Sequence, residues 1–216
     1  KLLCAGSSSR LMYLVKTPSL LKPFAKDLLW HVETTSKELY LTFDDGPTPQ
    51  VTEKALELLK RYNAHATFFC LGKNVEEHPS IYQRVLDDGH AVGNHSYDHP
   101  DGWKTAPFNY LRNVARARAF VNSSLFRPPY GRITPAQVNA LKKKFTLVMW
   151  DVLSADFDQQ KTPEQCLMHV NQNCRPGSIV VFHDSIKAER NMLYALEGSL
   201  AHFSEQGYIF RALSYP

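Results

Sequence analysis

The segment LYLTFDDGP, residues 39–47, decides how this chain of 216 residues folds and where its chemistry lies. Its apolar first half predicts a buried strand, and Gly46 followed by Pro47 predicts a turn directly after it. Two neighbouring carboxylates, Asp44 and Asp45, stand at that strand end, where a rigid element opens onto a surface. Taken alone, such a pair is typical of a polar turn. Adjacent aspartates become useful together when one binds a metal ion and the other handles a proton.

Two histidines, His95 and His99, follow a second strand-like segment, HAVG at residues 90–93, and lie within NHSYDHP at residues 94–100. Imidazole nitrogens suit zinc and similar divalent ions. Ser96 follows His95 directly, so the segment is not the His-Glu-x-x-His helix of zinc proteases. Pro100 disfavours a helix at His99, and we therefore expect a loop or one short turn there. Two imidazoles and one carboxylate, with positions left open, make a hydrolytic metal site.

Five short motifs, in their order along the chain, resemble those of the NodB-type polysaccharide deacetylases, also called carbohydrate esterase family 4. They are TFDDGP at residues 42–47, HSYDHP at 95–100, RPPYG at 127–131, DF at 156–157 and VFH at 181–183. The first three match closely, the fourth matches loosely, and the fifth matches by its histidine. The resemblance spans roughly residues 38–211, which makes it far more specific than any single motif.

The resemblance implies a division of roles among the residues of the first three motifs. Asp45, His95 and His99 would be the metal ligands, by the family's Asp-His-His pattern. Asp44 would be the general base that takes the proton of the attacking water. Arg127 would pair with this base and hold it in position, which its planar guanidinium suits. The divalent metal would be zinc first, with cobalt, nickel or manganese as other candidates, and it would polarise the acetyl carbonyl and acidify a water.

The remaining motif residues are implied to act on the substrate side. His183 would protonate the leaving amine, and Asp156 would hydrogen-bond His183 and keep it protonated. The backbone N–H of Tyr130 would stabilise the oxyanion. Substrate and oxyanion contacts are expected from Tyr130, Phe157, Val181 and Pro128. Of these, Phe157 and Val181 would shape a small pocket for the acetyl methyl.

The sequence departs from the family pattern at three positions around the expected sugar groove. Phe157 stands where the fourth motif usually has Trp, and Leu153 stands where that motif has an earlier Asp, with Asp151 and Asp158 nearby. Val181 replaces the usual Leu of the fifth motif. No departure removes an expected ligand or proton carrier, so they bear on the substrate rather than on the chemistry.

Several polar residues match no motif. Asp184, directly after His183, is interpreted as a loop residue. The histidines interpreted as structural or surface residues are His31, His65, His78, His90, His169 and His202. Cys70 lies in an apolar segment typical of a core strand, and the eight-residue spacing of Cys166 and Cys174 does not by itself predict a disulfide.

Strand-like and helix-like segments alternate along the chain. Strands are expected near residues 39–43, 66–70, 90–94, 125–126, 145–150, 178–182 and 208–210. Helices are expected near residues 52–62, 79–88, 107–122, 135–144, 163–173 and 191–206. This alternation predicts an α/β fold with a parallel sheet, and motifs at strand ends suggest a barrel with its site on the C-terminal face. The resemblance implies a distorted (β/α)7 barrel over residues 38–216, with residues 1–37 as an N-terminal extension packing on it.

Composition fits one compact enzyme domain. Hydrophobic residues make up 44% and charged residues 21%, and the net charge of +4 comes without a basic block. Nucleic acid is therefore not a favoured partner, and no segment is long and apolar enough to predict a transmembrane helix. The first nine residues, Cys4 included, are too short for a whole signal peptide and fit the remnant of one or an artificial start.

The function that the resemblance implies is metal-dependent hydrolysis of a linear amide, the removal of N-acetyl groups from a polysaccharide that contains N-acetylglucosamine. Peptidoglycan is the first substrate expected and chitin oligomers the second. The alternatives are an O-acetyl esterase acting on xylan, a deacylase of small amides, and a non-catalytic carbohydrate-binding protein. We expect a monomer, located in the cell envelope or secreted because of its substrate class.

Overall fold

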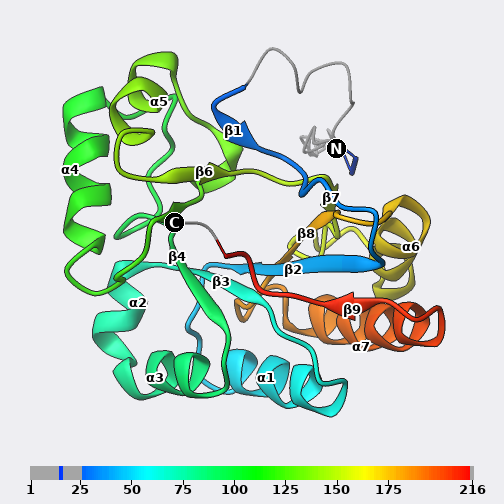
Figure 1. The fold of residues 1–216 in the computed structure, drawn as a ribbon. Coiled ribbons are helices and arrows are strands. Elements are labelled where there is room, and N and C mark those ends of the chain that lie inside the picture. Colours follow the sequence, from blue (N-terminus) through cyan, green and yellow to red (C-terminus); the bar gives the residue numbers. More distant parts are fainter. Residues whose placement is uncertain (1–14, 17–25, 215–216) are drawn as a thin grey trace, which may run out of the picture.

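The computed structural model describes residues 15–16 and 26–214, and in this part of the chain strands and helices alternate around one sheet (Figure 1). The strands are β1 (Leu28–Leu29), β2 (Glu38–Asp44), β3 (Thr67–Cys70), β4 (Ala91–Asn94), β5 (Leu125–Phe126), β6 (Thr146–Val148), β7 (Val152–Leu153), β8 (Ile179–His183) and β9 (Ile209–Phe210). The helices are α1 (Val51–Arg61), α2 (Gly72–Glu77), α3 (Pro79–Asp87), α4 (Pro107–Ala117), α5 (Pro135–Leu141), α6 (Pro163–Asn173) and α7 (Glu189–Glu205), with a 3-10 turn, η2 (Pro129–Gly131).

The sheet is parallel and curls into an incomplete barrel. Its order is β1-β6-β5-β4-β3-β2-β8-β7, with β9 also beside β2, and every pairing between these strands is parallel. The strands β1 and β7 end this order and do not pair with each other in the described part of the chain. The helices lie outside the sheet, with α1 and α3 on one side, α4 and α5 on another and α6 and α7 on a third (Figure 1). The predicted α/β fold with a parallel sheet is confirmed.

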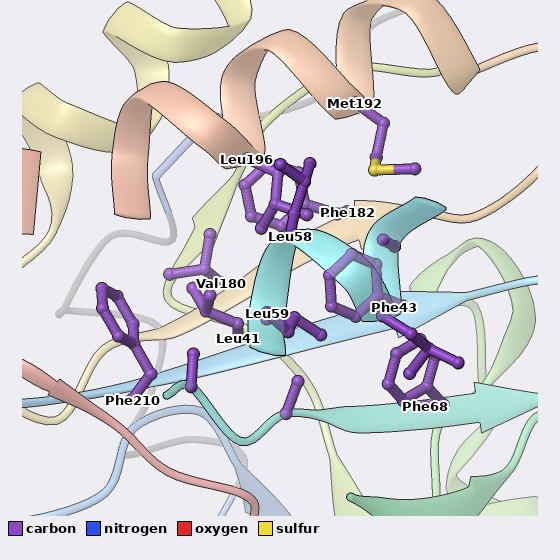
Figure 2. Packing of buried hydrophobic residues seen from close by; sticks show 14 of the residues in the cluster. Leu41, Phe43, Leu58, Leu59, Phe68, Val180, Phe182, Met192, Leu196 and Phe210 are labelled. Carbon is purple, nitrogen blue, oxygen red and sulfur yellow. The ribbon is translucent and has the colours of Figure 1, made fainter. Parts of the chain in front are cut away.

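The main core lies between the central strands and the two helices α1 and α7 (Figure 2). Alternate residues of β2, Leu41 and Phe43, are fully buried against these helices. The Phe43 ring stacks on the rings of Phe68 in β3 and Phe182 in β8, with centroid distances of 4.7 and 5.8 Å. This packing on neighbouring strands holds β2 rigidly, so the residues that follow it have a fixed position.

Parallel pairing places several motif residues at one edge of the sheet. Asp44, the last residue of β2, lies opposite Phe69 of β3 and His183 of β8. Asn94 at the end of β4 lies opposite Phe126 at the end of β5, and His95 and Arg127 come directly after these two. All of these strand ends are carboxyl ends, where sites on such barrels are built.

The differences from the expected elements are confined to short segments. The helix α2 and the strands β1 and β7 were not predicted, because they span six and two residues and are too short for a periodic pattern. The strand expected over residues 145–150 covers only Thr146–Val148. The helix expected to reach residue 122 ends at Ala117 and continues as turns.

The described residues before Glu38 contribute to the sheet. Leu28 and Leu29 pair with β6, His31 forms an antiparallel bridge with Ser178, and Lys16 forms one with Val152. The expectations about residues 1–14, Cys4 included, lie outside the described residues, and the boundary at residue 37 stays a prediction. Cys70, Cys166 and Cys174 are free thiols. None of the helices described is long and apolar enough to cross a membrane.

Candidate active site

Asp45, His95 and His99 converge at the carboxyl edge of the sheet. Asp45 Oδ1 lies 3.3 Å from His99 Nε2 and 3.7 Å from His95 Nε2. One ligand atom from each of the three residues falls within 4.8 Å of the others, which allows them to hold one metal ion. The two histidines lie in an irregular segment after β4, as expected, and His99 has a positive φ of 66°.

The surroundings of these three side chains fit a divalent cation. The His95 Nδ1 nitrogen lies 2.8 Å from the carbonyl oxygen of Arg127 and donates to it, which leaves Nε2 as a ligand. Burial and the neighbouring His95 lower the pKa of His99 to about 4, so its imidazole is neutral at neutral pH. Asp45 Oδ1 is buried and has no hydrogen-bond partner in the described part of the chain. A buried carboxylate oxygen in this position is costly unless a cation binds it.

Asp44 has a different partner from its neighbour Asp45. Its Oδ1 accepts a 2.7 Å hydrogen bond from Arg127 Nη1, and the Arg127 side chain is fully buried. Arg127 is held by further bonds to the Thr42 hydroxyl at 2.7 Å and to the Met149 carbonyl at 2.9 Å. The ion pair between Arg127 and Asp44 is therefore buried and does not lie on the protein surface.

The charge environment keeps Asp44 ionised. Burial raises the pKa of this carboxyl, but the charge and hydrogen bond of Arg127, together with the neighbouring His95 and His183, outweigh burial and leave the pKa below its usual value. Asp44 is 4% exposed and lines the same cavity as the two histidines. A carboxylate without a proton, beside a possible metal site, can accept a proton from water.

His183 and Asp156 form the expected pair on the other side of the cavity. His183 Nδ1 lies 2.7 Å from Asp156 Oδ1, and the His183 backbone N–H donates to Asp156 Oδ2 at 2.8 Å. Burial lowers the pKa of His183, but Asp156, Asp45 and Asp44 raise it to about 9. Its imidazole therefore carries a proton at neutral pH and can donate it.

A cavity of about 390 Å³ joins these groups. Its lining residues are Asp44, Asp45, His95, His99, Tyr130, Gly131, Arg132, Trp150, Leu153, Phe157, Val181, His183, Ser185 and Lys187. Phe157 packs edge-on against the His183 ring at 5.0 Å, and Leu153 occupies the wall where the family pattern has an Asp. Asp151 and Asp158, the other acids of that segment, are buried elsewhere and do not line the cavity.

Tyr130 enters the cavity from the η2 turn, whereas Pro128 does not. Tyr130 has a positive φ of 59°, and its ring meets His99 edge-on at 4.4 Å. Pro128 was expected among the substrate contacts, but it is buried and is not a lining residue. Its carbonyl accepts a hydrogen bond from Gly131 at 3.0 Å, so Pro128 closes the turn that presents Tyr130.

Sequence reasoning gave no role to Asp184, which packs behind the cavity, or to the lining residues Arg132, Trp150, Ser185 and Lys187. Asp184 is 1% exposed, and its carboxylate accepts from the Gly46 N–H at 3.0 Å and from the Thr52 hydroxyl at 2.5 Å. Its own N–H donates to the Asp44 carbonyl at 3.1 Å. Burial raises its pKa to about 7 against the effect of the Thr52 hydrogen bond. Its place directly after His183 and the glycine after Asp45 were the only signals, and neither says that the two meet.

Two imidazoles, a carboxylate and a proton-accepting acid at the carboxyl edge of a barrel are typical of metal-dependent hydrolases. Comparison with known proteins identifies the family to which this chain belongs. The family model for polysaccharide deacetylase matches residues 31–148. A peptidoglycan-N-acetylglucosamine deacetylase of Bacillus cereus is 36% identical over 155 residues, which cover 68% of this chain and 56% of that relative. A chitooligosaccharide deacetylase of Azorhizobium caulinodans is 33% identical over 180 residues, which cover 79% of this chain and 84% of that relative. The chain belongs to the polysaccharide deacetylase family, the NodB-type enzymes of carbohydrate esterase family 4.

A solved structure agrees with this placement. The crystal structure of the Bc1960 peptidoglycan N-acetylglucosamine deacetylase superposes with a TM-score of 0.83 at 30% sequence identity. The superposition covers 91% of this chain and 95% of that chain. The distorted (β/α)7 barrel implied by the motifs is thereby confirmed. The chain spans little more than half the length of the Bacillus cereus relative, so the likeness to that protein concerns only part of it.

Proposed function

We propose that this protein is a metal-dependent N-deacetylase of polysaccharides that contain N-acetylglucosamine. One observation carries the proposal: the adjacent carboxylates Asp44 and Asp45 have separate partners. Asp45 faces His95 and His99, whereas Asp44 is held by the buried Arg127. One aspartate is thus available to a cation and its neighbour to a proton, which metal-assisted hydrolysis requires.

Asp45, His95 and His99 would hold the cation, and their mixed nitrogen and oxygen ligands favour zinc. When bound, the cation supplies Lewis acidity at the acetyl carbonyl and at the attacking water. Asp44 accepts a proton from that water while the water oxygen forms its bond to the carbonyl carbon. Arg127 keeps the Asp44 carboxylate oriented, with Nη1 at 2.7 Å from its oxygen, and the burial of this pair prevents Asp44 from turning away.

The acetyl group would occupy the inner cavity. The Tyr130 backbone N–H stabilises the negative charge that develops on the carbonyl oxygen, as in other acyl-transfer sites. Phe157 and Val181, which line the cavity on the side of His183, contact the acetyl methyl. Their apolar side chains limit the access of other water molecules to this part of the cavity.

His183 completes the reaction by donating its proton to the sugar nitrogen as the carbon–nitrogen bond breaks. The products are acetate and a free amine on the sugar. Asp156, at 2.7 Å, stabilises the imidazolium form before donation and orients the ring. The proton that Asp44 takes from water and the proton that His183 gives to nitrogen balance the step.

Peptidoglycan is the first substrate we propose and chitin oligomers the second. The relatives support both, since one is named a peptidoglycan-N-acetylglucosamine deacetylase and another a chitooligosaccharide deacetylase. A substrate of the first kind places the protein in the cell envelope or outside the cell. The open cavity rim, where Tyr130 is 60% exposed, suits a polymer better than a small amide.

The test is acetate release from three substrates: peptidoglycan, N-acetylglucosamine oligomers and acetylated xylan. Each is incubated with zinc-loaded protein and with Asp44→Asn. The proposal predicts release from the two sugar amides and a loss of about 100-fold or more in the variant. Release from xylan alone would replace it with an O-acetyl esterase. Release from none, with zinc bound, would favour a small-amide substrate or a binding role.

A further inference from the structure

We propose that Trp103, Arg132 and Tyr130 form a second sugar-binding position, an aromatic ledge that takes the sugar residue adjacent to the one being deacetylated. This inference rests on the proposed function, because it assigns the ledge to the same glycan chain. It concerns the apolar face of an uncharged pyranose, which packs against aromatic rings.

The ledge begins inside the active-site cavity and leads away from it. Its inner end is Tyr130, whose ring meets the possible metal ligand His99 at 4.4 Å. The Arg132 guanidinium lies 5.7 Å from the Tyr130 ring and 5.2 Å from the Trp103 ring. Tyr130 and Arg132 both line the cavity, whereas Trp103 lies beyond its lining. A polymer with one acetyl group in the cavity would therefore extend over these side chains.

The ledge is held rigidly by its own contacts. Asp101 accepts a 2.6 Å hydrogen bond from Arg132 Nη1 and a 3.0 Å bond from the Trp103 backbone N–H. Gln137 donates to the Gly102 carbonyl at 2.9 Å. A Cβ at Gly102 would overlap the Arg132 carbonyl oxygen, so the loop and the segment after η2 approach each other as closely as glycine allows. A surface ordered in advance binds its ligand at a lower entropic cost.

The rings of the ledge are nevertheless open to solvent. Trp103 is 65% exposed and Tyr130 is 60% exposed, although both are anchored. Single exposed aromatic residues are common, but two on a fixed cavity rim, with a guanidinium between them, form a continuous binding face. Because Arg132 is paired with Asp101, the ledge carries little net charge. It therefore suits a neutral sugar face rather than an anionic group.

The test compares substrate lengths. Acetate release is measured with N-acetylglucosamine hexamer and with the shortest oligomer that the protein deacetylates, using zinc-loaded wild type, Trp103→Ala and Trp103→Phe. We expect Trp103→Ala to lower kcat/KM for the hexamer by about 10-fold through a higher KM, with kcat unchanged. For the shortest oligomer, Trp103→Ala should change kcat/KM by less than about 2-fold. Trp103→Phe should keep most of the wild-type kcat/KM for the hexamer.

A matched control is Phe108→Ala, which removes another exposed aromatic ring, 74% exposed on α4, outside the cavity lining. This variant should have the wild-type kcat/KM for both the hexamer and the shortest oligomer. Equal losses on short and long oligomers in Trp103→Ala, or no loss on either, would overturn the ledge. If wild type releases no acetate, the deacetylase proposal fails by itself. Hexamer binding by calorimetry then decides the ledge: weaker binding in Trp103→Ala supports it, and equal or absent binding overturns it.

Discussion

Asp184 and Gly46 join two strand ends that lie 138 residues apart in the sequence, through a 3.0 Å hydrogen bond from the Gly46 N–H to the Asp184 carboxylate. A Cβ at Gly46 would overlap that carboxylate. Gly46 follows the possible metal ligand Asp45, and Asp184 follows the proposed proton donor His183. The contact therefore fixes the spacing between the metal side and the proton-donor side of the cavity.

Asp184→Asn should weaken both metal binding and catalysis. The amide keeps the shape of the side chain but replaces one acceptor oxygen with an NH2 donor, so separate oxygens can no longer accept from both the Gly46 N–H and the Thr52 hydroxyl. We expect zinc affinity and kcat/KM each to fall by about 10- to 100-fold, as when groups that orient metal ligands are changed. Zinc affinity is measured by calorimetry and the rate by acetate release.

Thr52 offers a matched pair of variants for this contact. Thr52→Ser keeps the hydroxyl that donates to Asp184 and should behave as wild type, whereas Thr52→Val removes it and should resemble Asp184→Asn. Wild-type zinc affinity and activity in Asp184→Asn would show that the contact does not position the site.

Arg127→Ala should destabilise the fold as well as the activity. The change leaves the Asp44 carboxylate buried without the guanidinium that pairs with it. Breaking a buried ion pair in this way costs about 3–5 kcal/mol of unfolding free energy. Urea unfolding at neutral pH measures this loss. Arg61→Ala is the control, because the Arg61–Glu197 pair is exposed and should contribute little. Similar small changes in both variants would contradict the structural role given to Arg127.

The proposed proton donor predicts an alkaline limit to activity. The pKa of His183 is raised to about 9, so the protonated form is present at neutral pH and is lost as pH rises through that value. A bound cation lowers this pKa, and the activity of the loaded enzyme should therefore fall at or below pH 9. Asp156→Asn removes the negative charge that raises the pKa and should shift the fall to lower pH. A kcat profile against pH that is identical in the variant would exclude this role for Asp156.

His90, far from the site chemistry, should make the fold sensitive to acid. Burial and the nearby His65 lower the pKa of His90 to about 4, although Asp88 opposes this, and its Nδ1 accepts a hydrogen bond from the Ala66 N–H at 3.2 Å. The lowered pKa means that His90 favours folding above pH 6.5 and that this contribution is lost as pH falls toward 4.

Urea unfolding at pH 7 and pH 5 measures the effect of His90. Between pH 7 and pH 5, the free energy of unfolding should fall by about 2 kcal/mol more in wild type than in His90→Gln, whose glutamine side chain does not titrate. His65→Gln is the control for the neighbouring imidazole, and it should retain most of the wild-type loss. Equal losses in wild type and His90→Gln would contradict the prediction.

The site residues at strand ends could be predicted because the chain marks them locally. Asp44 and Asp45 follow an apolar strand directly, and His95 and His99 share one segment with a proline that prevents a helix. Parallel pairing then brings these strand ends to one edge, as the alternation of segments predicts. The pairing of Arg127 with Asp44 could be predicted only from the family motifs, because no pattern of neighbouring residues indicates it.

The missed features depend on contacts between distant segments. Asp184 was interpreted as a loop residue because its partners, Gly46 and Thr52, lie more than a hundred residues earlier. Pro128 was expected at the substrate because it lies in the same motif as Tyr130, yet the turn buries the first and exposes the second. The strands β1 and β7 have two residues each and acquire their conformation from neighbours.

The most direct test of the central claim is a zinc titration of chelator-treated protein, followed by acetate release from N-acetylglucosamine oligomers. The account predicts that activity appears with zinc and saturates near one equivalent. Asp44→Asn should bind zinc with similar stoichiometry and remain inactive, because it keeps the three ligands and loses only the proton acceptor. Full activity after the chelator, or activity in Asp44→Asn equal to wild type, would contradict the assignment of one aspartate to the metal and the other to the proton.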